Sequence, residues 1–71
     1  MTDYLVVIER EGSSWGAYCP DLPGVSVVGR SEDEVESLID DAVALHVAAL
    51  RRAGEGVPAP SAAGARTVTV R

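Results

Sequence analysis

Few side chains of this 71-residue chain could carry out chemistry. His46 is the only histidine and Cys19 the only cysteine, so no pair of histidines or thiols can form within the chain. A catalytic nucleophile needs a base beside it, and a metal site needs several converging ligands. His46 falls on the apolar side of a predicted helix, which favours a packed histidine. Cys19 has no basic neighbour in the sequence, which favours an unreactive thiol.

A run of acidic residues is the second feature that could do chemistry. Consecutive helical residues point in different directions, and the run lacks the alternating acids and central glycine of a calcium loop. The main interpretation is therefore a solvated helix face that compensates the helix dipole, and a docking surface for a basic partner is the alternative. No glycine-rich phosphate loop occurs, so we predict no cofactor and no metal. The acidic residues of this run are Glu32, Asp33, Glu34, Glu36, Asp40 and Asp41.

The charge balance limits the choice of partners. Eleven acidic and six basic residues give a net charge of -5. Such a surface repels phosphate backbones, so we expect no direct binding to nucleic acid and favour a basic protein as partner. Apolar runs such as Leu5–Ile8 are too short to cross a membrane. A single cysteine is typical of a reducing compartment, and we expect a cytoplasmic protein.

Three short strands are predicted in the first part of the chain. Residues 4–8, 15–19 and 25–28 are rich in β-branched, aromatic and other apolar residues. A polar hairpin loop is predicted over residues 9–14, and a turn over residues 21–24, which read Asp-Leu-Pro-Gly. Connections this short join antiparallel strands, because a parallel return needs a crossover of about a dozen residues. The sequence therefore predicts an antiparallel three-stranded meander.

One helix is predicted over residues 32–53. Ser31 and Glu34 fit a capping box, in which the Ser31 hydroxyl accepts from the Glu34 amide and the Glu34 carboxylate reaches back to the Ser31 amide. Gly54 stands where a left-handed C-cap is expected. Apolar or packed residues recur at spacings of three and four and define the side that faces the sheet. They are Val35, Leu38, Ile39, Ala42, Val43, His46, Ala49, Leu50 and Ala53.

A fourth strand is predicted after an extended connector of small residues, prolines and glycines over residues 54–64. Residues 66–71 read Arg-Thr-Val-Thr-Val-Arg. Val68 and Val70 fall on one face and the threonines on the other, the alternation of a half-buried strand. The order is β-β-β-α-β, which gives an α+β fold in one domain over residues 1–71, with one helix packed on one face of the sheet.

The first strand carries apolar residues on both faces. Tyr4, Val6 and Ile8 point to one side, and Leu5 and Val7 point to the other. One helix covers only one face, so a monomer leaves apolar surface open. The sequence predicts a homodimer or higher homo-oligomer, or a protein partner on this face.

The order of several motifs resembles the HicB-like antitoxin family over nearly the whole chain. Cys-Pro-Asp-Leu-Pro-Gly at 19–24 is followed by Gly-Arg-Ser at 29–31, an acidic helix start, and Val-Pro-Ala-Pro-Ser at 57–61. This resemblance implies a partly degraded RNase H-like fold without nuclease activity. It also implies that the protein neutralises a small basic mRNA-cleaving toxin, HicA, by covering its active-site surface. We expect residues 1–71 to form this domain alone, with no C-terminal DNA-binding domain.

If the resemblance is right, the strand-to-strand turn and a nearby tryptophan are candidate partner-binding residues. The structural alternatives are turn formation by the Pro-Gly pair and core packing by the tryptophan. The candidates are Trp15, Tyr18, Asp21, Leu22, Pro23 and Gly24.

Two other functions stay open at this point. One is a stand-alone oligomeric HicB-like protein without a toxin partner, and the other is a residual RNA-binding or hydrolytic role. An RNase H-type site needs carboxylates around two metal ions about 4 Å apart. The predicted strands offer only Asp3 and Glu9, about 20 Å apart along an extended strand. We therefore predict that the protein is not an enzyme.

Overall fold

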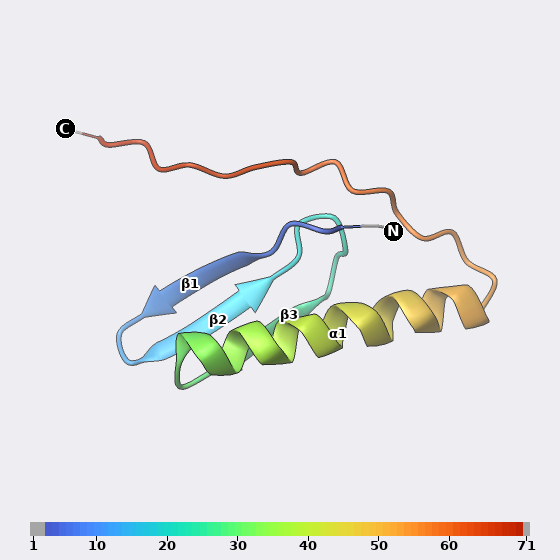
Figure 1. Cartoon of the computed structure of the whole chain (residues 1–71), viewed down its shortest axis with the longest axis horizontal. Helices are drawn as coiled ribbons and strands as arrows, with labels where there is room; N and C mark the ends of the chain where they lie inside the picture. Colours follow the sequence, from blue (N-terminus) through green and yellow to red (C-terminus); the bar gives the residue numbers. More distant parts are fainter. Residues whose placement is uncertain (1–2, 71) are drawn as a thin grey trace.

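The fold consists of one antiparallel sheet and one helix. A computed structural model describes residues 3–70 of the chain, with strands β1 (Val7–Glu11), β2 (Ser14–Tyr18) and β3 (Ser26–Gly29), followed by helix α1 (Glu32–Arg52) (Figure 1). The strands lie in the order β1-β2-β3, and both neighbouring pairs are antiparallel. The predicted α+β class, the antiparallel meander and the packing of the helix on the sheet are confirmed.

Strand β1 includes residues that were predicted as loop. Glu9, Arg10 and Glu11 pair with β2, and Glu11 lies opposite Ser14. The prediction of a hairpin loop over residues 9–14 was therefore wrong, because the turn needs only two residues. Gly12 has a φ of 60°, which glycine adopts without steric cost and which fits the first position of a tight hairpin turn. An edge strand with one open face accepts these charged side chains.

The residues before β1 are extended but do not belong to the ladder. Val7 lies opposite Tyr18, so continued pairing would bring Leu5 opposite Pro20. Proline has no N–H to donate, and the chain turns at this point. Tyr4 and Val6 nevertheless pack against the core.

Helix α1 begins and ends close to the predicted residues. The Ser31 hydroxyl accepts from the Glu34 amide at 3.1 Å, as predicted. The Glu34 carboxylate, however, accepts from the Arg30 amide at 3.3 Å, one residue before the expected donor. The chain leaves α1 through Gly54, which has a φ of 72°. No helix in the described part of the chain is both long enough and apolar enough to cross a membrane.

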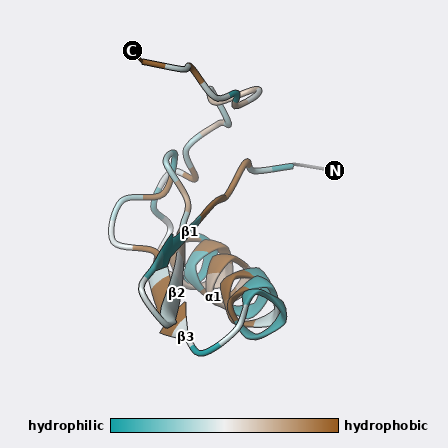
Figure 2. Ribbon diagram, turned by 90° about the vertical axis from the view of Figure 1, so that its left-hand side faces the viewer, coloured by the Kyte–Doolittle hydropathy of each residue, from teal (hydrophilic) through white to brown (hydrophobic). Residues whose placement is uncertain are grey.

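The core lies between α1 and one face of the sheet (Figure 2). Tyr4, Val6 and Ile8 pack against it, whereas the opposite side of β1 faces away from α1. The predicted division of β1 into two faces is confirmed. The buried hydrophobic residues of this core are Ala17, Cys19, Leu22, Val25, Val35 and Ile39.

The apolar side of α1 differs in part from the prediction. Val35 and Ile39 are buried, and Val47, which the predicted stripe left out, packs against the core. Leu38 is 40% exposed and Ala49 is exposed. The sheet is narrow, so only the centre of the stripe is covered and residues at its margins reach solvent.

The predicted fourth strand is absent from the described residues. Residues 66–70 are extended but unpaired, and Arg71 lies outside the described part of the chain. Val68 and Val70 are 68% and 88% exposed. The chain leaves the body of the protein after the connector and runs beside no strand of its own sheet (Figures 1 and 2). The alternation therefore produces an extended conformation, and the valines find no surface within this chain on which to pack.

The burial of Leu22 gives a first prediction. Replacing Leu22, which is fully buried, with Ala leaves a cavity, and we expect a loss of about 2–5 kcal/mol in the free energy of unfolding. Urea denaturation followed by circular dichroism measures it. Val28→Ala is the matched control, because Val28 is 80% exposed. Equal losses for both variants would contradict the core position of Leu22.

Candidate partner-binding surface

The loop between β2 and β3 is closed by its own backbone. The Cys19 amide donates to the Val25 carbonyl at 3.2 Å, and the Val25 amide donates to the Leu22 carbonyl at 3.1 Å. The Leu22 amide donates to the Cys19 carbonyl at 3.2 Å. Gly24 has a φ of 87°, which a residue with a Cβ adopts only with strain. The loop is therefore a compact turn that holds the Leu22 side chain in the core.

Asp21 fastens the connector to this loop. One carboxylate oxygen of Asp21 accepts from the Ser61 and Ala62 amides at 3.0 Å each, and the other accepts from the Ser61 hydroxyl at 2.6 Å. We call these three hydrogen bonds the Asp21 clamp. The Ser61 hydroxyl, with the Ala62 and Ser61 amides, favours the ionised carboxylate and lowers the pKa of Asp21 below its ordinary value of 3.8. The Tyr4 hydroxyl donates to the Pro58 carbonyl and provides a second attachment.

The structure brings four of the six candidate residues around one hollow of about 280 Å³. Tyr18, Pro23 and Gly24 are exposed there, and Tyr18 is 39% exposed. Leu22 also borders the hollow, although its own side chain is fully buried. The participation of these residues in partner binding stays a prediction.

The other two candidates lie elsewhere. The carboxylate of Asp21 is engaged in the clamp. Trp15 is half-buried on the side of the sheet that faces α1, and the Arg10 guanidinium lies 5.7 Å from its ring centre. This contact has the geometry of a cation–π interaction. Both residues therefore have contacts within the chain that account for their positions.

The face of the sheet that points away from α1 was not fully identified from the sequence. We call it the outer sheet face and define it by Val7, Glu9, Glu11, Tyr18 and Val28, which alternate with the inward residues. Val28 is 80% exposed, and Glu9, Glu11 and Val28 border a hollow of about 200 Å³. The alternation of residues along β1 indicated in the sequence that one side of the strand faces away from α1. Glu9 and Glu11 were predicted as loop residues, however, and were therefore not assigned to this face.

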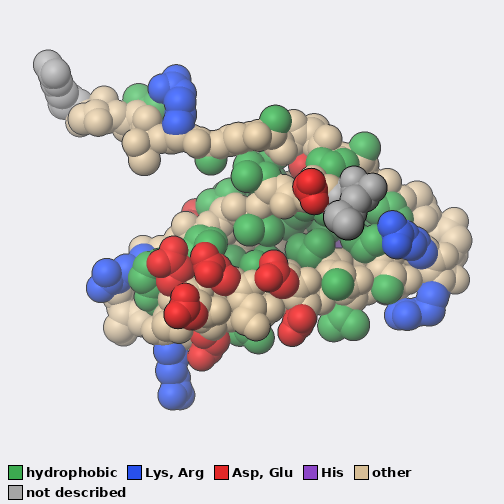
Figure 3. Space-filling view, in the orientation of Figure 1, with side chains coloured by type: hydrophobic (Ala, Val, Ile, Leu, Met, Phe, Trp, Pro, Cys, Tyr) green, Lys and Arg blue, Asp and Glu red, His purple; other side chains and the backbone are tan. Residues whose placement is uncertain are grey.

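Few other side chains in the described residues could take part in catalysis or metal binding. Cys19 is buried, and His46 is half-buried beside a shallow hollow with Val25, Ala42 and Leu45. Among residues 3–70, no group of three or more His, Cys, Asp or Glu side chains is arranged to hold a metal ion. The acidic run lies over the N-terminal half of α1, where red side chains gather in Figure 3.

The comparisons with known proteins agree with the motifs. Residues 4–68 match the family model described as HicB-like antitoxin of bacterial toxin–antitoxin system. No curated protein and no solved structure matches the chain.

The Asp21 clamp predicts a dependence on pH. The folded pKa of Asp21 is lowered, so the clamp contributes its full stability above pH 3.8 and loses it as the pH falls through the folded value. We expect a carboxyl NMR titration of Asp21 with a midpoint below 3.8. Ser61→Ala removes the hydroxyl donor but keeps both amides, and its midpoint should lie higher. Ser61→Thr keeps the hydroxyl and serves as control. Identical midpoints for Ser61→Ala and the parent chain would contradict the clamp.

Proposed function

Because the chain belongs to the HicB-like antitoxins of bacterial toxin–antitoxin systems, we propose that it neutralises a small, basic, mRNA-cleaving toxin similar to HicA by covering its active-site surface. The family match over residues 4–68 is the observation that carries this proposal. The net charge of -5 supports it, because an acidic protein is attracted to a basic one and repelled by RNA.

The outer sheet face and the adjoining loop are the proposed contact surface. Tyr18 and Val28 supply exposed apolar area, and Glu9 and Glu11 place negative charge beside it. An apolar centre with charged groups at its rim is the usual composition of a protein interface. Tyr18 belongs to the outer sheet face and also borders the hollow beside Pro23 and Gly24. The sheet face and the loop therefore form one continuous surface.

The proposal assigns binding and no catalytic step to this chain. A toxin that cleaves mRNA acts where mRNA is translated, so the antitoxin acts in the cytoplasm. The three-stranded meander and its helix form the part of an RNase H-like fold that the family retains. No cofactor is required for a surface that acts by covering another protein.

Self-association is the second part of the proposal. Both β1 and β3 are edges of a three-stranded sheet, and unpaired edges are sites for pairing with another chain. The domain is also small, so a second copy adds buried surface that one chain cannot provide. The chain therefore acts as a homodimer or a higher homo-oligomer.

The test of the proposed function uses the small basic protein encoded beside the gene for this chain. We expect that protein to cleave mRNA in vitro and the purified chain to stop the cleavage at an equimolar ratio. Cleavage that continues with the chain in excess would overturn the neutralisation. If no neighbouring gene encodes a basic protein, the alternative of a stand-alone oligomeric HicB-like protein is supported instead.

Substitutions on the outer sheet face test the proposed surface. Tyr18→Ala should weaken toxin binding about tenfold or more, since a buried tyrosine is a typical interface hot spot. Glu9→Arg with Glu11→Arg should slow association, most strongly at low salt. Glu36→Arg with Asp41→Arg on α1 changes the net charge equally and is the matched control. Calorimetry and stopped-flow fluorescence measure both effects, and equal losses for the two charge variants would contradict the assignment to this face.

A further inference from the structure

The C-terminal arm, which we define as residues 63–70, is an extended segment without a pairing partner in its own chain. All its residues are exposed, and Val68 and Val70 are 68% and 88% exposed. The arm is extended and leaves the body after Ala62 (Figures 1 and 2). A single alternating strand of this kind has no stability by itself and gains it by pairing with a sheet edge.

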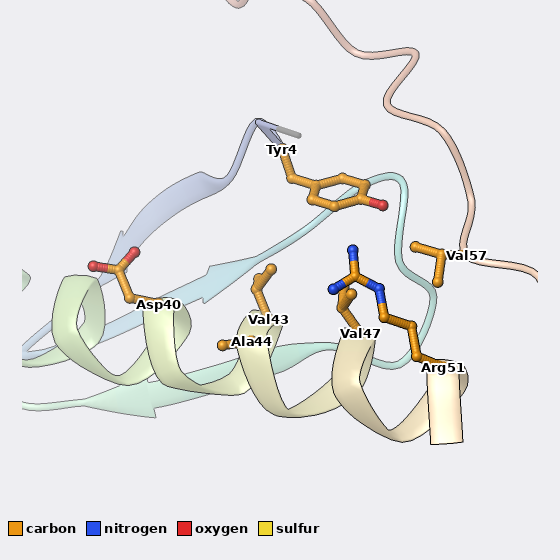
Figure 4. Close-up of a pocket in the computed structure, with 7 residues that line it drawn as sticks. All are labelled: Tyr4, Asp40, Val43, Ala44, Val47, Arg51 and Val57. Carbon is orange, nitrogen blue, oxygen red and sulfur yellow. The ribbon is translucent and has the colours of Figure 1, made fainter. Parts of the chain in front are cut away.

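Strand β1 has an open edge, and a hollow lies beside the residues that precede it. Helix α1 packs mainly beneath β3 and β2 and contacts β1 least. On this side the flank of α1 has a hollow of about 500 Å³ below Tyr4, whose apolar lining is flanked by the charged side chains of Asp40 and Arg51 (Figure 4). A strand added beside β1 would extend the sheet over this flank of α1. Its inward side chains would then face this flank of α1.

The alternation of the arm separates its threonines from its valines. Val68 and Val70 share a face with Arg66, which stands at the beginning of the alternating run, and the threonines lie on the other face. Strand β1 contributes Glu9 and Glu11, both exposed on the outer sheet face. If Val68 and Val70 point toward α1, the threonines of the arm lie on the same face as the two glutamates. Pairing thus buries the apolar face of the arm and leaves its polar face in solvent.

The fastening of the connector holds the base of the arm beside the residues that precede β1. The Asp21 clamp holds Ser61 and Ala62, and the Tyr4 hydroxyl holds Pro58. Beyond these contacts the eight residues of the arm can span about 26 Å at 3.3 Å per residue, more than the five residues of β1 require. An arm that is fixed at its base and projects from the body can reach an equivalent edge on another molecule.

We propose that the C-terminal arm pairs with β1 of a second copy of this chain, and that the two copies exchange arms about a twofold axis. The fourth strand of each sheet is then supplied by the partner. A reciprocal exchange pairs the β1 edge of both copies at once and forms a closed dimer. This inference rests on the proposed self-association and is independent of toxin binding.

The first experiment uses light scattering on the full chain and on two variants with equal changes in charge. Val68→Lys with Val70→Lys places charge on the face predicted to be buried, and we expect a monomer at concentrations where the parent chain is a dimer. Thr67→Lys with Thr69→Lys changes the solvent face, and we expect a dimer. Circular dichroism verifies that both variants keep the meander and α1. A parent dimer that the valine variant preserves would overturn the arm exchange but leave self-association intact, and a monomeric parent would overturn both.

The second experiment identifies which chain supplies the strand. Glu9→Cys and Thr69→Cys are made in two differently tagged chains, which are refolded together and oxidised. Exchange places the two thiols in different molecules, so we expect a covalent heterodimer on a non-reducing gel; Glu9→Cys with Thr67→Cys samples the neighbouring register. Glu36→Cys replaces Glu9→Cys as the control and should give no such product. A bond that forms only within one chain carrying both cysteines would overturn the exchange.

Discussion

The burial of Leu22, Val35 and Ile39 between the sheet and α1 is the contact on which the rest of the structure depends. These are the largest fully buried side chains in the described residues, and the sequence contains no phenylalanine to enlarge the core. A core this small requires the β2–β3 loop to turn inward, since Leu22 comes from that loop. The outer sheet face and the C-terminal arm are therefore left without cover.

Local signals predicted the helix well and the strands less precisely. Ser31 and Gly54 define the limits of α1 because capping depends on neighbouring residues and on backbone conformation. The limits of β1 depend on what lies opposite each residue. Pairing extends to Glu11 because Ser14 faces it, and it does not reach Leu5, whose opposite position is Pro20. The strand limits predicted from hydrophobicity followed the apolar residues alone and therefore did not match this pairing.

The partner-binding candidates illustrate a second limit of sequence reasoning. Proline, aspartate and glycine in the β2–β3 loop correctly indicated a turn, but a turn in the sequence does not reveal which side chains point inward. Leu22 is buried, and Asp21 binds residues 40 and 41 positions away in the sequence. The alternation of residues 66–70 likewise predicted an extended conformation, but the identity of a pairing edge depends on tertiary or quaternary structure. Distant contacts of this kind leave no local pattern.

The Asp21 clamp also has a consequence for the order of folding. The hairpins and α1 join segments that are neighbours in the sequence, so their loop-closure entropy is small and their contacts can form early. The bonds from Asp21 to Ser61 and from Tyr4 to Pro58 connect residues 40 and 54 positions apart. The bonds to Asp21 require the β2–β3 loop to be formed. The bond from Tyr4 requires the segment before β1 to be packed against the core. We therefore expect the connector to dock after the loop has formed, and during synthesis docking waits until Ser61 and Ala62 have left the ribosome.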